Sequence, residues 1–109
     1  MLGSDVMRGY NDMLILHLLM EKDSYGYEIS KDIEWLCKGM YNIKETTLYS
    51  AFGRLEKLNF VTAYQGTQSQ GRPRTYYAIT DKGKEVYRQK CEEWKILKSV
   101  INTFTMEGK

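Results

Sequence analysis

The segment "MRGYNDMLILHLLM" at residues 7–20 constrains the fold more than any other part of the chain. Its apolar side chains recur at helical spacing and leave little of the helix circumference polar. A helix that is apolar on most sides is buried on most sides. A chain of 109 residues forms one small domain with a modest core. We therefore expect this helix to pack against a partner subunit as well as against its own chain.

Two amphipathic helices are expected next, over residues 25–38 and 44–58. In both segments, apolar side chains recur at steps of three and four and so share one face. Asp23 or Ser24 can cap the first of these helices, because Asp and Ser are preferred N-cap residues. Asn59 stands where the second must end, and Asn tolerates the left-handed conformation that terminates many helices.

The helix over residues 44–58 has a polar face as well as an apolar one. Asn42 and Glu45 have the spacing of a capping box at its start. Gly53 lies inside the helix and costs up to about 1 kcal/mol relative to Ala, so we expect something to approach the backbone closely there. The polar face is made of Thr46, Thr47, Ser50, Arg54 and Lys57, with Tyr49 at its border.

Residues 60–65 and 74–80 are rich in β-branched and aromatic side chains, and a Gly-, Ser- and Gln-rich stretch separates them. This pattern predicts a β-hairpin. Tyr77 is expected to point to the core from the second strand, which leaves Arg72 and Arg74 on the outer face because their parity is opposite.

A long final helix is expected over residues 81–105, with Thr80 as its cap. An apolar seam runs along this helix at the spacing of a coiled coil. The members of the seam are Tyr87, Cys91, Trp94, Leu97, Ile101 and Phe104.

The elements occur in the order helix, helix, helix, hairpin, helix. The predicted fold is mainly α with a small antiparallel β-hairpin (α+β): a winged helix-turn-helix over residues 1–80 and a separate helix over 81–109. In that plan the third helix enters the major groove of DNA, and the hairpin, called the wing, straddles the backbone. Residues 44–79 carry five basic and two acidic side chains, a balance that suits an anionic partner.

The predicted DNA contacts lie on the third helix and the wing. Hydroxyl groups near the start of the helix can donate to phosphates or base edges, basic groups supply charge, and the helix N-terminus favours an anion. A winged helix that binds another protein is the competing interpretation, and it would expose apolar residues on this face. Tyr49 is alternatively a tyrosine at the border of the core. The candidates for double-stranded DNA are Lys44, Thr46, Thr47, Tyr49, Ser50, Arg54, Arg72 and Arg74.

Catalysis is not expected of this chain. The sequence has no nucleophile elbow, no phosphate-binding Gly-rich loop and no recognisable carboxylate pair. His17 is the single histidine, which excludes a multi-histidine metal cluster, and Cys37 and Cys91 have no metal or redox spacing. We expect no metal, no cofactor, no membrane span and a cytoplasmic location.

Three segments resemble signatures of the PadR family of transcriptional regulators: "YGYEI" at 25–29, "TLYSAFGRLEKLNFV" at 47–61 and "GRPRTYYAITDKG" at 71–83. The resemblance covers nearly the whole chain, with Asn59 in place of the Gly that often ends the recognition helix. It fits the small subgroup with a single C-terminal helix, which includes repressors of multidrug-efflux genes. It implies a homodimeric repressor of a pseudo-palindromic promoter site. In such a dimer, residues 81–109 form the dimerisation helix and pack against helix one of the partner subunit.

The resemblance also implies a ligand site. In the small subgroup a tryptophan of the last helix lines a cavity at the dimer centre, where flat drugs stack against it. Trp94 is the matching residue here, with Met7 and Tyr10 beside it and Met13 and His17 as further candidates. A small aromatic effector would bind there and release the DNA. A tryptophan buried in the dimer seam without any ligand is the alternative interpretation.

Overall fold

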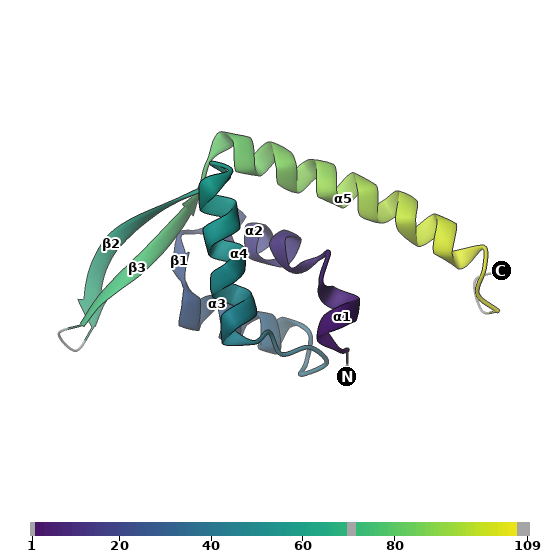
Figure 1. Cartoon of the computed structure of the whole chain (residues 1–109), viewed down its shortest axis with the longest axis horizontal. Helices are drawn as coiled ribbons and strands as arrows, with labels where there is room; N and C mark the ends of the chain where they lie inside the picture. The colour runs from purple at the N-terminus through teal and green to yellow at the C-terminus, as the bar shows by residue number, and fades with distance from the viewer. Residues whose placement is uncertain (1, 70–71, 107–109) are drawn as a thin grey trace.

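The computed structural model describes residues 2–69 and 72–106 and confirms the predicted fold class. Helices α2, α3 and α4 lie together, a long hairpin leaves them on one side, and α5 projects beyond them on the other (Figure 1). Within the described ranges, no helix is long and apolar enough to cross a membrane. The elements are α1 (Ser4–Met7), α2 (Asn11–Glu21), β1 (Ser24–Tyr25), α3 (Gly26–Leu36), α4 (Glu45–Lys57), β2 (Val61–Ser69), β3 (Arg72–Ile79) and α5 (Asp81–Asn102).

The first predicted helix is interrupted. α1 ends at Met7 and α2 begins at Asn11, so the single helix expected over residues 7–20 is wrong at its start. Gly9, a weak helix former, lies in the break. The expected burial of this segment within its own chain is confirmed for α2, whose buried apolar side chains are Ile15, Leu16, Leu18 and Leu19.

Both amphipathic helices are present, but the predicted cap of α3 is wrong. The N-cap of α3 is Tyr25, and it makes no side-chain cap hydrogen bond. Ser24, which was expected with Asp23 as the cap, belongs to β1 instead, and its hydroxyl donates a 2.5 Å hydrogen bond to Glu28 Oε1. The chain is extended here because β1 pairs with β3.

The capping box predicted at the start of α4 is wrong as well. The N-cap is Lys44 and not Asn42, and no side-chain cap hydrogen bond is made there. Tyr41 and Ile43 are buried on either side of Asn42, so this stretch packs into the core ahead of the helix rather than opening it.

The predicted end of α4 is confirmed. Asn59 adopts a left-handed conformation with φ of 65°. Its N–H donates to the Glu56 carbonyl at 3.0 Å, and the N–H of Phe60 donates to the Leu55 carbonyl at 2.9 Å. This pair of hydrogen bonds is the Schellman motif, which satisfies the last carbonyl groups of a helix.

The hairpin is part of a three-stranded antiparallel sheet in the order β1-β3-β2. Its two long strands extend beyond the predicted ones and pair from Val61 opposite Ile79 out to Ser69 opposite Arg72. Sequence reasoning missed β1, because a strand of two residues is too short to show an alternating pattern. We keep the name wing for β2 and β3.

The core lies between α2, α3, α4 and the inner face of the wing. Phe52 of α4 stacks on Tyr77 of β3 with ring centroids 4.0 Å apart and planes 11° from parallel. The inward orientation predicted for Tyr77 is therefore confirmed, and the stack joins α4 directly to the wing. The other large buried side chains are Ile15, Leu16, Leu19, Ile29, Leu48, Leu55 and Val61.

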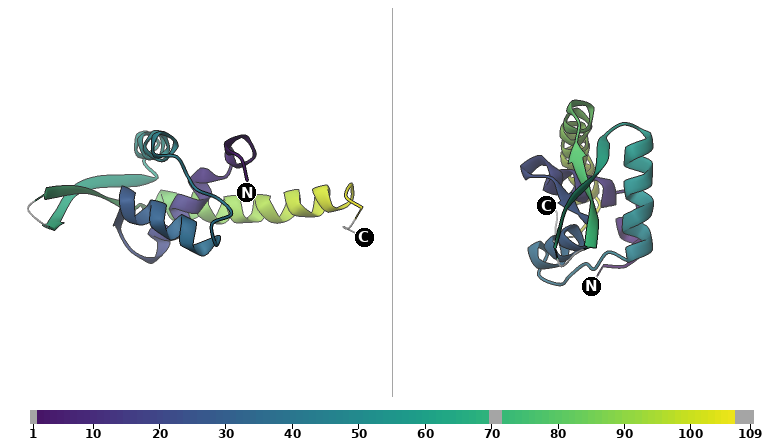
Figure 2. Two further views of the ribbon diagram at one scale, coloured as in Figure 1. Left: turned by 90° about the horizontal axis from the view of Figure 1, so that it is seen from below. Right: turned by 90° about the vertical axis from the view of Figure 1, so that its left-hand side faces the viewer.

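α5 is attached to this body at its first turn. The Thr80 hydroxyl accepts a 3.0 Å hydrogen bond from the N–H of Gly83, which confirms the predicted cap. The helix then runs alongside α2, and only its C-terminal part projects beyond the other elements (Figure 2). It ends at Asn102, and three members of the predicted seam are exposed: Trp94, Ile101 and Phe104.

Candidate nucleic-acid interface

The outer face of α4 carries most of the predicted DNA contacts. Leu48, Ala51, Phe52 and Leu55 bury the inner face, so the intervening residues point away from the core. Lys44 is the N-cap of α4, so its positive charge lies at the N-terminus of the helix, which itself favours an anion. Of the remaining candidates on α4, Thr47 is half-buried and the others are exposed: Thr46, Tyr49, Ser50 and Arg54.

Tyr49 bridges the outer face of α4 and the first turn of α3. Its ring meets Phe52 edge-on at 5.5 Å and covers Gly26, where an added methyl group would lie 2.8 Å from Tyr49 Cζ and closer still to the hydroxyl. The ring is nevertheless 49% exposed. Tyr49 is therefore both a border residue of the core and a hydroxyl presented beside the N-terminus of α3. Glycine at position 26 is what leaves room for it.

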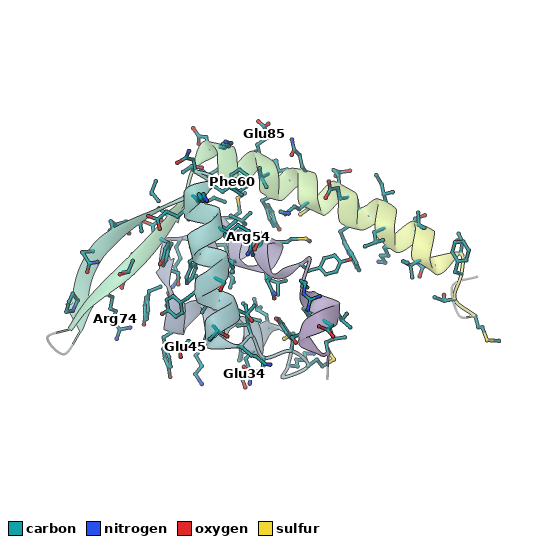
Figure 3. All side chains as sticks on the ribbon, in the orientation of Figure 1. Glu34, Glu45, Arg54, Phe60, Arg74 and Glu85 are labelled. Carbon is teal, nitrogen blue, oxygen red and sulfur yellow. The ribbon has the colours of Figure 1, made fainter. Side chains whose placement is uncertain are left out.

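Arg54 has a partner within the chain that sequence reasoning missed. Its Nε and Nη2 donate to the two carboxylate oxygens of Asp12 at 3.2 and 2.5 Å. The Asp12 side chain is 19% exposed and that of Arg54 is 49% exposed. Figure 3 shows Arg54 on the side of α4 that faces α2. The hydrogen bonds to Asp12 raise the pKa of Arg54. Only two of the five N–H donors of a guanidinium take part in this pair.

Arg74 lies on the wing but does not simply point outward as expected. Its Cζ sits 4.3 Å from the centroid of the Tyr25 ring, a cation–π geometry, and the residue is half-buried. In Figure 3 the Arg74 side chain hangs from the wing at about the level of Glu45, which marks the start of α4. The prediction for Arg72 concerns a side chain that lies outside the described part of the structure.

Gly53 is exposed on the outer face of α4. A methyl group built there meets nothing within 4 Å among the described residues, so the close approach expected at Gly53 does not come from this chain. The backbone of α4 is open to an external partner at this point.

The three ligand candidates lie together. The rings of Tyr10 and Trp94 meet edge-on with centroids 5.8 Å apart. Both residues and Met7 line an apolar groove of about 580 Å³ between α1, α2 and α5, and Met13 also lines it. His17 does not reach this groove: its Nδ1 is 2.8 Å from the Tyr87 hydroxyl.

A neighbouring apolar groove of about 720 Å³ lies between α2, α3 and the connector that follows α3. Met7, Met13 and His17 line it together with Leu36 and Met40. Among the described residues, no group of three histidine, cysteine or carboxylate side chains could hold a metal ion.

Comparison with known proteins finds a matching sequence family and similar solved structures. The sequence model described as "Transcriptional regulator PadR-like family" matches residues 15–89. A transcriptional regulator from Clostridium thermocellum is 55% identical, with a TM-score of 0.89 over 96% of this chain and 99% of its own. A PadR family transcription regulator from Clostridium difficile R20291 is 40% identical, with a TM-score of 0.75 over 88% of this chain and 98% of its own.

The fold is also that of a protein solved with DNA. Bacillus subtilis PadR in complex with operator DNA has a TM-score of 0.67 at 24% identity, over 76% of this chain and 46% of that protein's chain. At that identity the likeness concerns the fold.

Proposed function

The chain belongs to the PadR-like family of transcriptional regulators, and on this premise we propose that it binds promoter DNA as a homodimer and represses transcription. The family is one of regulators, so the prediction that the chain is not an enzyme is confirmed. The observation that carries DNA binding is the polar outer face of α4 beside a wing that holds Arg74. The operator complex of Bacillus subtilis PadR supports DNA as the ligand that this fold takes.

In the proposed complex α4 lies in the major groove and the wing lies on the adjacent backbone. Thr46, Thr47 and Ser50 donate to base edges or phosphates, and Tyr49 donates its hydroxyl to a phosphate. Lys44 and the wing arginines Arg72 and Arg74 contribute charge to the interface, and Arg54 does so with the donors that Asp12 does not occupy. The rival interpretation, a winged helix that binds protein, would need an apolar outer face on α4, and the exposed face there is polar.

The proposed dimer rests on the apolar side chains that α5 leaves uncovered. Phe104 is 84% exposed and Ile101 is 50% exposed, and burial of such side chains is worth roughly 1.5–3 kcal/mol each when complete. Residues 81–109 are the dimerisation segment in this proposal, and residues 1–80 the DNA-binding domain. A two-fold dimer presents two copies of α4 to a pseudo-palindromic site, about 34 Å apart.

Fluorescence anisotropy with a labelled duplex from the region upstream of its own gene tests DNA binding. We expect binding to weaken as the salt concentration rises. Arg74→Ala should make the slope of log affinity against log salt concentration less negative by about 0.9 if one phosphate contact is lost. Arg88→Ala is the matched control, because Arg88 is an exposed arginine on α5, away from the wing. Equal slopes for wild type and both variants would reject the wing contact. No salt-dependent binding at all would reject the proposed function.

A small aromatic effector is the second part of the proposal. It is supported by the groove in which Trp94, Tyr10 and Met7 meet, and binding there would change the spacing of the two α4 helices. Flat hydrophobic dyes can be titrated while tryptophan emission is followed in a Trp35→Phe background, since Trp35 is 78% exposed and would add its own signal. A dye that releases DNA without changing Trp94 emission would contradict this site. Repression itself is tested with a reporter gene fused to the same promoter. We propose the cytoplasm as the location of the protein.

A further inference from the structure

Four side chains contact one another in series along one face of the wing, and we call them the wing-root stack: Arg74, Tyr25, Tyr76 and Tyr64. The Arg74 Cζ lies 4.3 Å from the ring centroid of Tyr25. The ring centroids of Tyr25 and Tyr76 are 5.3 Å apart with planes tilted by 57°, and the rings of Tyr76 and Tyr64 are stacked with centroids 5.8 Å apart. The stack therefore joins all three strands of the sheet, because Tyr25 belongs to β1, Tyr76 to β3 and Tyr64 to β2.

The backbone holds the wing-root stack in register. Tyr76 pairs with Tyr25 on one side and with Tyr64 on the other. The Tyr64 hydroxyl donates a 2.5 Å hydrogen bond to Asp23 Oδ2, which ties β2 to the chain just before β1. A methyl group at Gly66 would collide with the Tyr76 ring, so glycine at this position lets the ring lie across β2. The stack is thus positioned from both neighbouring strands.

We propose that Tyr25 is a positioning residue for DNA binding: its ring holds the Arg74 guanidinium in place for a backbone phosphate. This inference rests on the proposed DNA binding and assigns the wing contact to a residue outside the recognition helix. Tyr25 is also the N-cap of α3, so it couples the direction of Arg74 to the helix-turn-helix itself rather than to the wing alone.

The chemistry of the contact suits this role. A cation over an aromatic face is attracted by the ring quadrupole, so the contact does not consume the N–H donors that recognise a phosphate. An arginine side chain has many rotamers, and contacts that restrict them before binding lessen the ordering cost that lowers affinity. A cation–π contact at a partly exposed site corresponds to about a two- to five-fold change in an equilibrium constant. That is the size of the effect expected from removing the ring.

A double-mutant cycle on the full-length protein tests the proposal. Tyr25→Leu removes the ring but keeps an apolar side chain, Tyr25→Phe keeps the ring, and Arg74→Ala removes the cation. Affinity for the upstream duplex is measured by anisotropy at several salt concentrations, and thermal melting confirms that each variant is folded. Tyr27→Leu is the matched control, because Lys31 lies 5.5 Å from the centroid of that exposed ring on α3.

We expect Tyr25→Leu to weaken binding about two- to five-fold when Arg74 is present and to have no effect in the Arg74→Ala background. Tyr25→Phe should bind like wild type, and Tyr27→Leu should not couple to Arg74. A loss of equal size in both backgrounds would overturn the proposal, and so would the absence of any loss. In either case the wild type would still bind DNA, so only the positioning role would be rejected. A wild type that does not bind DNA would reject the proposed function with it.

Discussion

Gly83→Ala is expected to destabilise the fold at the junction of the wing and α5. A methyl group at position 83 would lie 2.8 Å from Ile79 Cγ1 and closer still to the carbonyl oxygen of Phe60, whereas real Cβ contacts essentially never fall below 3.0 Å. The oxygen belongs to the backbone, and the Thr80 N–H binds it at 3.0 Å, so it cannot rotate away as a side-chain tip would. The first turn of α5 must therefore shift.

Three contributions set the magnitude. Overpacking of this kind costs typically about 1–3 kcal/mol. A shift of the first turn also weakens the cap hydrogen bond from Gly83 N–H to Thr80, and a lost cap costs about 0.5–2 kcal/mol. Alanine gains up to about 1 kcal/mol over glycine in helix propensity. The expected net loss of stability is about 0.5–4 kcal/mol, read as a lower urea midpoint by circular dichroism at equal protomer concentration.

The same substitution at Gly53 is the matched control. Gly53 is also helical, but a methyl group there meets nothing within 4 Å among the described residues. Gly53→Ala should therefore stabilise the protein by about 0.4–1 kcal/mol through propensity alone. If Gly83→Ala unfolds within about 0.5 kcal/mol of wild type while Gly53→Ala behaves as expected, the reasoning from close packing at the junction is refuted.

Three further predictions concern the buried hydrogen bond between Asn11 and Tyr41 and the packing of Gly26 against Tyr49. Asn11→Ala should lower the free energy of unfolding in urea by about 1–3 kcal/mol, because it leaves the buried Tyr41 hydroxyl without its 2.6 Å acceptor. Burial raises the pKa of the Tyr41 hydroxyl above its ordinary value of 10.0. The stability that the neutral hydroxyl contributes is therefore complete below about pH 10 and is lost as the pH rises further. Tyr41→Phe should reduce this alkaline loss of stability, measured by urea titration at several pH values. Gly26→Ala should weaken DNA affinity in anisotropy while leaving the urea midpoint nearly unchanged, because only the flexible Tyr49 ring must move to admit the methyl group.

Sequence periodicity predicted the longer helices and strands, because only these contain enough residues to repeat a pattern. The third helix, the hairpin and the last helix could be read from the spacing of their apolar side chains. Asn59 marked the end of α4 because Asn tolerates the left-handed conformation, and Thr80 marked the start of α5 because its hydroxyl caps the helix. The caps at Ser24 and Asn42 failed for a different reason. Each is a good local cap, but strand pairing and core packing put these residues to another use.

The candidate site was predictable in outline and not in its internal contacts. An outward face on α4 follows from helical periodicity, so Thr46, Ser50 and Arg54 could be placed together. Asp12 is 42 residues from Arg54, and no local pattern connects them. The contact of Arg74 with Tyr25 depends on β1, a strand too short to predict. Long-range pairs of single side chains are set by tertiary structure, which periodicity does not encode.

The junction at residues 59 and 60 joins α4, the wing and α5. The Phe60 N–H closes the end of α4 on Leu55, and the Phe60 carbonyl accepts the N–H of Thr80 at the start of α5. The Thr80 hydroxyl donates a 2.7 Å hydrogen bond to the Asn59 carbonyl while it caps α5. β2 begins at the next residue, so the wing starts from the same point. The proposed change in the direction of α5 on ligand binding would therefore reach α4 through four hydrogen bonds, two between backbone groups and two made by the Thr80 hydroxyl.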